Sequence, residues 1–462
     1  MKRVLIFLLI TLQPIFSQNI VTDTIVHEVE RKETLFSISQ KYKININDIL
    51  MLNPQLRNSR LKRKSKILIP VIESIQEKTL VEKDSLPTED DLLRLDSIFV
   101  KKRKRDNQLN LSVLLPFRSN TVNYDSIEEV ESLFEDRNLY TITLDFYSGI
   151  LYAIEDLREL NVSINLNVFD TENSINKINE ISSENSVKDS DVIIGPLIPR
   201  NFETFSNIEL LELIPKVFPL STIPIKITKG VIQSVTPKNL LRERMINYLD
   251  KNLDREENIV IIADSLNNEI ESKLSEIFPN SIKIKPEFEG YILPELLDSL
   301  LVDSLPNKVI VESEIFTLIS SVVSQLNSQI TSERDVKLYT TYRGNQYDDP
   351  SINIKDLGNL AFTYTSISKK INNDSISKFE SRYLNLFGCL PNKDVIRGYD
   401  VTKDILLRAL IDKNLNRTTK YDEQSYTESK FLYKKDTLGG LFNSSMFILR
   451  HREYDIEEII DQ

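Results

Sequence analysis

The chain contains 462 residues, of which 40% are hydrophobic and 27% charged, and its formal net charge is -11. At about 150 residues per domain, this length accommodates two or three globular domains. The acidic excess excludes a general nucleic-acid binder, because such proteins need a basic face to displace the counterions of phosphates. One cysteine excludes a disulfide framework, and two histidines leave little material for a zinc centre or a histidine-based catalytic site.

Residues 1–18 have the pattern of a secretory signal peptide. Lys2 and Arg3 precede the apolar run Val4–Leu12, and a processing site follows at Phe16–Gln18. The run is shorter than the about 20 residues that a membrane-spanning helix needs. The alternative is a buried N-terminal strand. We expect an exported, periplasmic protein that does not span the membrane.

Residues 27–70 predict a small strand–helix–helix–strand module. Its motifs resemble those of the LysM family, and we place the module at residues 26–71. The motifs are Lys32-Glu33-Thr34-Leu35, Ile38-Ser39-Gln40-Lys41-Tyr42, Asn53-Pro54 and Ile67-Leu68-Ile69-Pro70. Lys32 and Lys64 replace two glycines of the family, and a lysine is costly there if the backbone needs a positive φ.

The LysM resemblance implies binding to polymers that contain N-acetylglucosamine, such as peptidoglycan glycan. By position, the implied sugar contacts are Glu33, Thr34 and Leu35 on one wall of a groove and Asn53, Pro54, Gln55 and Leu56 on the other. Backbone groups would meet the acetamido group, and apolar side chains its methyl group and the ring face. Alternatives stay open: Leu35 and Leu56 as core residues, and Asn53 as a helix cap.

Residues 72–108 are rich in Glu, Lys, Asp and Ser and predict a charged linker. Leu92, Leu93, Leu95, Ile98 and Phe99 favour a short amphipathic helix within an otherwise extended tether. The basic run Lys101–Arg105 follows. It is either a solvated linker charge or a contact for anionic lipid, and export argues against nucleic acid.

From residue 109 to 462, short apolar strands alternate with helical stretches. The expected elements are strands at 111–116, 164–169, 191–195, 217–221, 259–263 and 308–311, and helices at 144–157, 175–185, 239–249, 269–277 and 318–326. Continuous Val/Ile runs between helices indicate parallel strands buried on both faces, so we expect an α/β fold. A domain of this size exceeds one comfortable core, and two lobes are expected.

The order of motifs in this region resembles type I periplasmic-binding proteins, a family that includes branched-chain amino-acid binding proteins. The supporting segments are Leu114–Phe117, Val168–Asp170, Ile193–Pro196, Phe218–Thr222, Gly398–Asp400 and Leu438–Phe442. The resemblance implies two Rossmann-like lobes that close on a ligand. We assign about 109–232 with 368–430 to the first lobe and about 233–367 with 431–462 to the second.

The same resemblance implies a ligand site between the lobes. Ser221 and Thr222 match a polar run that contacts amino acids in the family, and Glu312 or Glu314 is the candidate partner for an α-ammonium group. Ile198 and Pro199 stand where the family has a serine or threonine, so the set of polar ligand contacts that the resemblance implies is incomplete. The alternatives are Ser221-Thr222 as a helix cap and Glu312 as a solvated loop charge.

Two functions follow from these patterns. The first is a peptidoglycan-bound protein that captures a small solute such as an amino acid or peptide. The second is a peptidoglycan-anchored scaffold or regulator that has lost the solute and binds an envelope protein. We expect no enzyme, metal site or cofactor, since HExxH and GxSxG motifs are absent and His27 and His451 lie in different modules. A glycosidase with paired carboxylates stays open.

Overall fold

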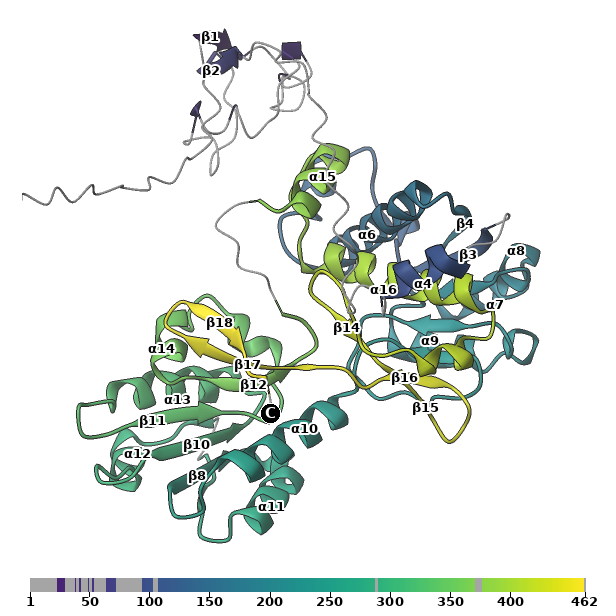
Figure 1. Ribbon diagram of the computed structural model, residues 1–462. Coiled ribbons are helices and arrows are strands. Elements are labelled where there is room, and N and C mark those ends of the chain that lie inside the picture. The colour runs from purple at the N-terminus through teal and green to yellow at the C-terminus, as the bar shows by residue number, and fades with distance from the viewer. Residues whose placement is uncertain are drawn as a thin grey trace, which may run out of the picture. The chain divides into compact units, whose positions relative to one another are not determined.

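A computed structural model describes residues 23–29, 38, 41–42, 49, 52–53, 64–71, 94–102, 107–286, 290–369 and 376–460 (Figure 1). The chain forms two compact units, Met1–Leu86 and Pro87–Gln462.

The first unit contains the two strands predicted for the small module. β1 (Asp23–Glu28) pairs antiparallel with β2 (Lys66–Val71). The core residues that the structure describes here are Val29, Ile38, Ile49, Ile67 and Ile69, with Tyr42 packed against them. Ile38, Lys41, Tyr42, Ile49 and Leu52 have helical backbone, as the expected strand–helix–helix–strand order requires, and the other residues expected in the two helices lie outside the described ranges.

Lys64, which replaces a glycine of the LysM family, lies in the left-handed backbone region with φ of 65°. Its N–H donates to the Val29 carbonyl at 2.8 Å, and the Val29 N–H donates to the Ser65 carbonyl at 2.9 Å. These two bonds hold the turn before β2 against the end of β1. A side chain with a Cβ costs about 1–2 kcal/mol in this region, so the turn is strained by the lysine.

The first lobe of the second unit is built on a seven-stranded sheet in the order β15-β16-β7-β6-β5-β3-β4. All neighbours pair in parallel except β15 with β16. The strands are β3 (Gln108–Leu115), β4 (Ser163–Asp170), β5 (Val192–Ile194), β6 (Lys216–Phe218), β7 (Val231–Gln233), β15 (Tyr433–Lys435) and β16 (Leu441–Asn443).

Helices cover both faces of this sheet, because alternate strand residues point to opposite sides. Leu111, Val113 and Leu115 pack in one core with α6 and α16, and Leu114 packs in another with α7 and α9. The helices are η2 (Ser119–Thr121), α5 (Ile127–Ser132), α6 (Leu139–Glu159), α7 (Ile175–Ile181), α8 (Asn185–Lys188), α9 (Pro199–Ser206), η3 (Glu209–Leu211), α15 (Lys378–Phe387), α16 (Lys393–Ile411) and η7 (Leu415–Lys420).

The second lobe has a seven-stranded sheet in the order β18-β17-β12-β11-β10-β8-β9. Five strands are parallel, β17 pairs antiparallel with β12, and β18 pairs antiparallel with β17. The strands are β8 (Asn258–Ala263), β9 (Ile282–Ile284), β10 (Asn307–Glu312), β11 (Val336–Tyr339), β12 (Thr363–Ser366), β17 (Phe447–Arg452) and β18 (Asp455–Glu458).

Helices lie on both faces of the second sheet as well. Val309 and Val311 pack with α12, α13 and α14, whereas Ile310 packs with α10 and α11 on the other side. The helices are α10 (Lys238–Asn252), η4 (Ser265–Asn267), α11 (Asn268–Ile277), α12 (Pro294–Leu300), α13 (Phe316–Ser328), η6 (Asn345–Asp348) and α14 (Ile354–Asn359). The two parallel-dominated sheets confirm the expected α/β class.

The chain crosses between the lobes from β7 to α10, from β12 to α15 and from β16 to β17 (Figure 1). The predicted lobe limits need one correction. Residues 433–443, assigned from sequence to the second lobe, form β15 and β16 of the first sheet, since Leu441 pairs with Ile232 of β7 and is buried in the first core. A short hairpin of β13 (Gln424–Ser425) and β14 (Lys430–Phe431) precedes them.

The predicted linker also needs a correction at its end. The short helix expected there is present as α4 (Leu95–Lys102), but it is packed on the first lobe and is no part of an extended tether. Leu95 and Phe99 are each only 1% exposed and lie in the core with α16. The Leu95 N–H donates to the Gln424 side chain at 2.9 Å, which fixes the helix start.

Candidate functional site

Asn53 is the one predicted glycan contact among the described residues. Its side chain is 1% exposed and its amide donates to the carbonyls of Ile49 and Leu68, both at 2.7 Å. Its oxygen accepts from the Leu68 N–H at 2.8 Å. Asn53 therefore caps the end of the second helix, as its alternative interpretation expected, and also ties that end to β2. Its sugar contact stays a prediction. Glu33, Thr34, Leu35, Pro54, Gln55 and Leu56 lie outside the described residues.

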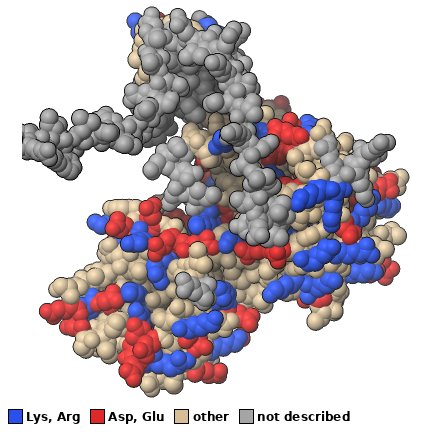
Figure 2. All heavy atoms as spheres, in the orientation of Figure 1, with Lys and Arg blue, Asp and Glu red and all other residues tan. Residues whose placement is uncertain are grey.

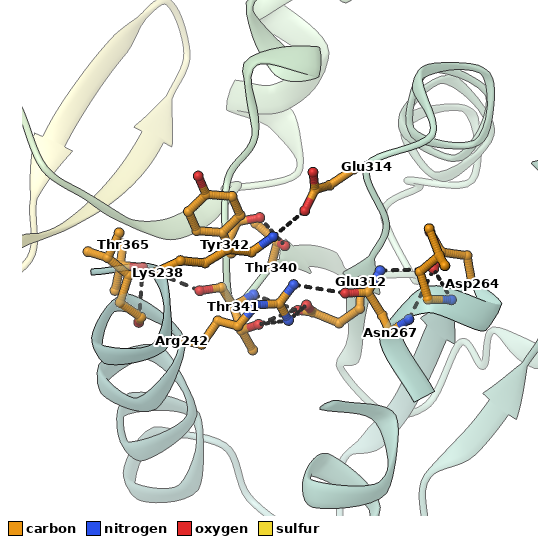
Figure 3. Close-up of polar contacts among 12 residues, drawn as sticks. Lys238, Arg242, Asp264, Asn267, Glu312, Glu314, Thr340, Thr341, Tyr342 and Thr365 are labelled. Carbon is orange, nitrogen blue, oxygen red and sulfur yellow. Dashed lines mark hydrogen bonds and ion pairs between the residues drawn. The ribbon is translucent and has the colours of Figure 1, made fainter. Parts of the chain in front are cut away.

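In the second unit, polar side chains gather where the strands of the second sheet end (Figure 3). β10 ends at Glu312, Thr340 to Tyr342 follow β11, and Thr365 lies near the end of β12. The carboxyl ends of parallel strands share one edge of a sheet, which is where α/β proteins bind ligands. α10 begins beside this edge, so Lys238 and Arg242, one helical turn apart, both reach it.

Glu312 lies at the centre of this edge and is 1% exposed. It forms an ion pair with Arg242 at 2.8 Å and accepts from the Thr341 N–H at 2.6 Å and the Thr341 hydroxyl at 2.7 Å. Burial raises the pKa of Glu312, and the Arg242 guanidinium and the two Thr341 donors oppose that rise. The alternative of a solvated loop charge is therefore wrong for Glu312.

Arg242 extends the cluster to the end of β8. Its guanidinium donates to the Asn267 side chain at 2.8 Å and to the Thr341 hydroxyl at 3.2 Å. The Asp264 carboxylate accepts from the N–H groups of Leu266 and Asn267 and from the Asn267 amide, so it caps η4 and orients Asn267. These groups position one another, and most of their hydrogen-bonding capacity is used within the protein.

A second layer of the edge is more exposed. The Lys238 ammonium pairs with Glu314 and lies 4.4 Å from the centroid of the Tyr342 ring. The side chain of Lys238 is 31% exposed and that of Glu314 is 49% exposed. The Tyr342 hydroxyl lies 2.9 Å from the hydroxyl of Thr222, which belongs to the first lobe. This hydrogen bond brings one predicted residue of the first lobe to the polar edge of the second.

Ser221 makes its polar contacts within its own loop and with β7. Its hydroxyl accepts from the Ile223 N–H at 3.1 Å, and its carbonyl accepts from the Gln233 amide at 3.2 Å. The structure thus brings together Thr222, Tyr342 and the Glu312 cluster, while Ser221 shapes the adjacent turn. Whether any of them contacts a ligand stays a prediction.

Sequence reasoning missed Arg242, Thr341, Tyr342 and Lys238. Two signals pointed to them: the spacing of Lys238 and Arg242 at the start of a helix that directly follows a crossing, and the polar Thr340-Thr341-Tyr342 run after a buried strand. Neither signal shows that these residues contact Glu312, because that requires the order of strands in the sheet. β10 and β11 become neighbours only through long-range pairing.

Within the described ranges, no group of three or more His, Cys, Asp or Glu side chains is arranged to hold a metal ion. Among the same residues, no helix combines the length and apolar character needed to cross a bilayer.

Comparisons with known proteins agree with both resemblances. Residues 27–70 match the family described as LysM domain. No curated protein matches the chain in sequence. A solved structure provisionally described as a branched-chain amino acid ABC transporter from Rhodospirillum rubrum is similar with a TM-score of 0.53 and 12% identity, over 77% of this chain and 100% of that one.

LpoA from Haemophilus influenzae is similar with a TM-score of 0.50 and 12% identity, over 78% of this chain and 59% of that one. At these identities the likeness shows the fold alone. Residues 27–70 are a LysM domain, and the second unit has the two-lobed fold of type I periplasmic binding proteins.

Proposed function

We propose that this protein is a cell-envelope scaffold or regulator, held on peptidoglycan by its LysM domain, whose two-lobed domain binds a protein partner and not a small solute. One observation carries the second part. The three side chains expected to meet a solute are engaged with the protein itself: Glu312 with Arg242 and Thr341, Thr222 with Tyr342, and Ser221 within its loop. A zwitterionic solute would have to displace a buried, fully paired carboxylate, which is costly.

The peptidoglycan part rests on the LysM match and is tested by co-sedimentation with purified peptidoglycan. We expect residues 19–462 to pellet and a chain lacking residues 27–70 to stay in the supernatant. Because the units Met1–Leu86 and Pro87–Gln462 are each compact, residues 19–86 alone serve as the positive control. Equal pelleting of the deletion variant would refute the assignment.

The scaffold part is tested by a thermal-shift screen over amino acids and short peptides. A solute at 100 times its Kd would stabilise the domain by about 2.7 kcal/mol, an easily visible shift. We expect no shift with any of them. We also expect immobilised residues 87–462 to bind one envelope protein in a pull-down, in stoichiometric amount. Added amino acids should not release that protein.

A second candidate function, capture of an amino acid or peptide, is favoured by the exposed pair of Lys238 and Glu314 beside Tyr342. Lys238 could release Glu314 and bind the carboxylate of a zwitterion, and Glu314 could then bind its ammonium group. A thermal shift that is lost in Lys238→Gln and in Glu314→Gln, but retained in the exposed lobe-2 control Lys251→Gln, would establish this candidate in place of the scaffold.

A further inference from the structure

The first lobe carries a strongly basic face that the proposed function does not use. Exposed basic side chains from α4, η7 and β15 form it: Lys101, Lys102, Arg417, Lys420, Lys434 and Lys435. Figure 2 shows Lys and Arg gathered over this part of the first lobe. The same three elements contain one acidic residue, Asp96, which pairs with Arg94 at 3.1 Å. We call this surface the basic face.

Direct contacts hold the three elements together. The Lys102 ammonium donates to the Tyr421 hydroxyl at 2.9 Å, which links α4 to the residue after η7. Lys102 and Lys420 lie 5.6 Å and 5.4 Å from the centroid of the same Tyr421 ring. The Asn416 side chain of η7 donates to the Gly439 carbonyl in the turn after β15 at 3.4 Å. The basic face is therefore one surface and not three separate charge runs.

Most of its charges lack acidic partners. Among the residues that the structure describes, Lys101, Lys420, Lys434 and Lys435 have no carboxylate within ion-pair distance. Arg417 has Asp412 at 3.7 Å. The chain as a whole carries -11, so solubility does not require this concentration of positive charge, and like charges held together repel one another. An anionic partner would relieve that repulsion.

The chemistry of the face indicates which anionic partner it fits. Five of its six charges are lysines, which offer single mobile charges and not the forked geometry of arginine. Protein interfaces instead concentrate energy in aromatic and arginine anchors. At the rim, Val100 is 53% exposed and Leu438 54%, and such side chains can enter the interfacial region of a bilayer. Diffuse lysine charge with exposed aliphatic residues suits a lipid surface.

We propose that the basic face docks on the surface of a bilayer that contains anionic phospholipids. The contact is peripheral and electrostatic, so it weakens as salt is added. It is independent of the LysM domain and would give the two-lobed domain a membrane contact in addition to the proposed wall contact.

The test is co-sedimentation of residues 19–462 with vesicles of phosphatidylcholine containing phosphatidylglycerol, compared with pure phosphatidylcholine. We expect binding only to the anionic vesicles. Each lysine near such a surface strengthens binding about fivefold, so Lys434→Gln with Lys435→Gln should weaken it more than tenfold. Lys101→Gln with Lys420→Gln, on two other elements of the face, should do the same, and unchanged melting of both variants shows that they fold.

The matched control is Lys251→Gln with Lys355→Gln, which removes the same charge from exposed positions of the second lobe and should leave binding unchanged. Equal binding to both vesicle types, or equal loss in the control, would overturn the proposal. Release by inorganic phosphate at constant ionic strength would point to a free anion site instead. Loss of peptidoglycan pelleting in the variants, without vesicle binding, would point to the wall polymer.

Discussion

The two lobes each bury an ion pair, but they use it differently. In the first lobe, Asp404 and Arg408 lie one turn apart on α16, 2.8 Å from each other, and their side chains are 0% and 1% exposed. Arg408 also donates to the Thr418 carbonyl, and the Tyr426 hydroxyl donates to Asp404. This pair is closed within the core of one lobe.

In the second lobe, Glu312 and Arg242 come from a strand and a helix, and Thr341 joins them from the segment after β11. Arg242 stays 11% exposed and lies at the edge where Tyr342 meets the first lobe. The comparison teaches that burial of charge alone does not identify a functional site. What distinguishes the second pair is its place, because it lies at the edge where Tyr342 contacts Thr222 of the other lobe.

The largest effect is expected from Arg408→Met in the first lobe. The variant leaves the Asp404 carboxylate buried without its counter-charge, so unfolding free energy should fall by about 3–5 kcal/mol. Urea denaturation measures the loss, and hydrogen exchange should place it in the first lobe. Adding Asp404→Leu should recover much of it. A loss below about 1 kcal/mol would show that the pair is not closed in solution.

Acid should act on the second lobe through His451. The ring is 3% exposed, packs near Phe362 and Tyr364, and neither ring nitrogen has a hydrogen-bond partner among the described residues. Burial, with Arg343 nearby, lowers the pKa of His451 to about 4 from 6.5. Between these pH values the unfolded state binds the extra proton, so stability falls as pH falls, by about 3 kcal/mol.

His451→Phe should remove that part of the acid sensitivity, because a similar ring then fills the site without titrating. The matched control is His27→Phe in the first unit, since the chain has two histidines. Denaturation of each variant at pH 7 and near pH 4 separates this contribution from that of the carboxylates. An unchanged pH dependence in His451→Phe would mean that the ring is hydrated in solution.

Arg242→Met should destabilise the second lobe by about 2–3 kcal/mol, less than Arg408→Met does in the first. Thr341 continues to donate two hydrogen bonds to Glu312, and the arginine is less deeply buried. Hydrogen exchange should locate the loss at β10 and β11. An equal loss in both lobes would contradict the view that the edge cluster belongs to the second lobe alone.

Much of the fold follows from local patterns. The strands around Val113, Ile193, Ile261 and Val309 are continuous apolar runs between helices, and this pattern predicts each of them as a buried parallel strand. β15 was not predicted, because Tyr433–Lys435 is too short to show a periodic pattern. It joins the sheet by pairing with β16, which in turn pairs with the distant strand β7. α4 was recognised as a helix, but its docking on α16 depends on Leu95 and Phe99 finding a core that only the folded lobe provides.

The site was predictable only in part. A glutamate after a buried strand predicted Glu312, since strand ends meet at one edge of a sheet. Its partner Arg242 lies on a helix whose position depends on where the chain crosses between lobes, so no local pattern pairs them. For Asn53 the local motif was enough to identify the residue but not its role. Its hydrogen bonds to Leu68 of β2 became visible only in the structure.

The smallest effect is expected from Thr222→Val, which removes the hydroxyl facing Tyr342 across the lobes. The bond is 2.9 Å long and partly solvated, so its loss should cost about 1 kcal/mol or less. A double-mutant cycle with Tyr342→Phe measures the coupling, and small-angle scattering should show more open particles for either variant. If the two substitutions are additive and the scattering is unchanged, the lobes do not meet through these hydroxyls, and the edge of the second lobe lies open to a ligand.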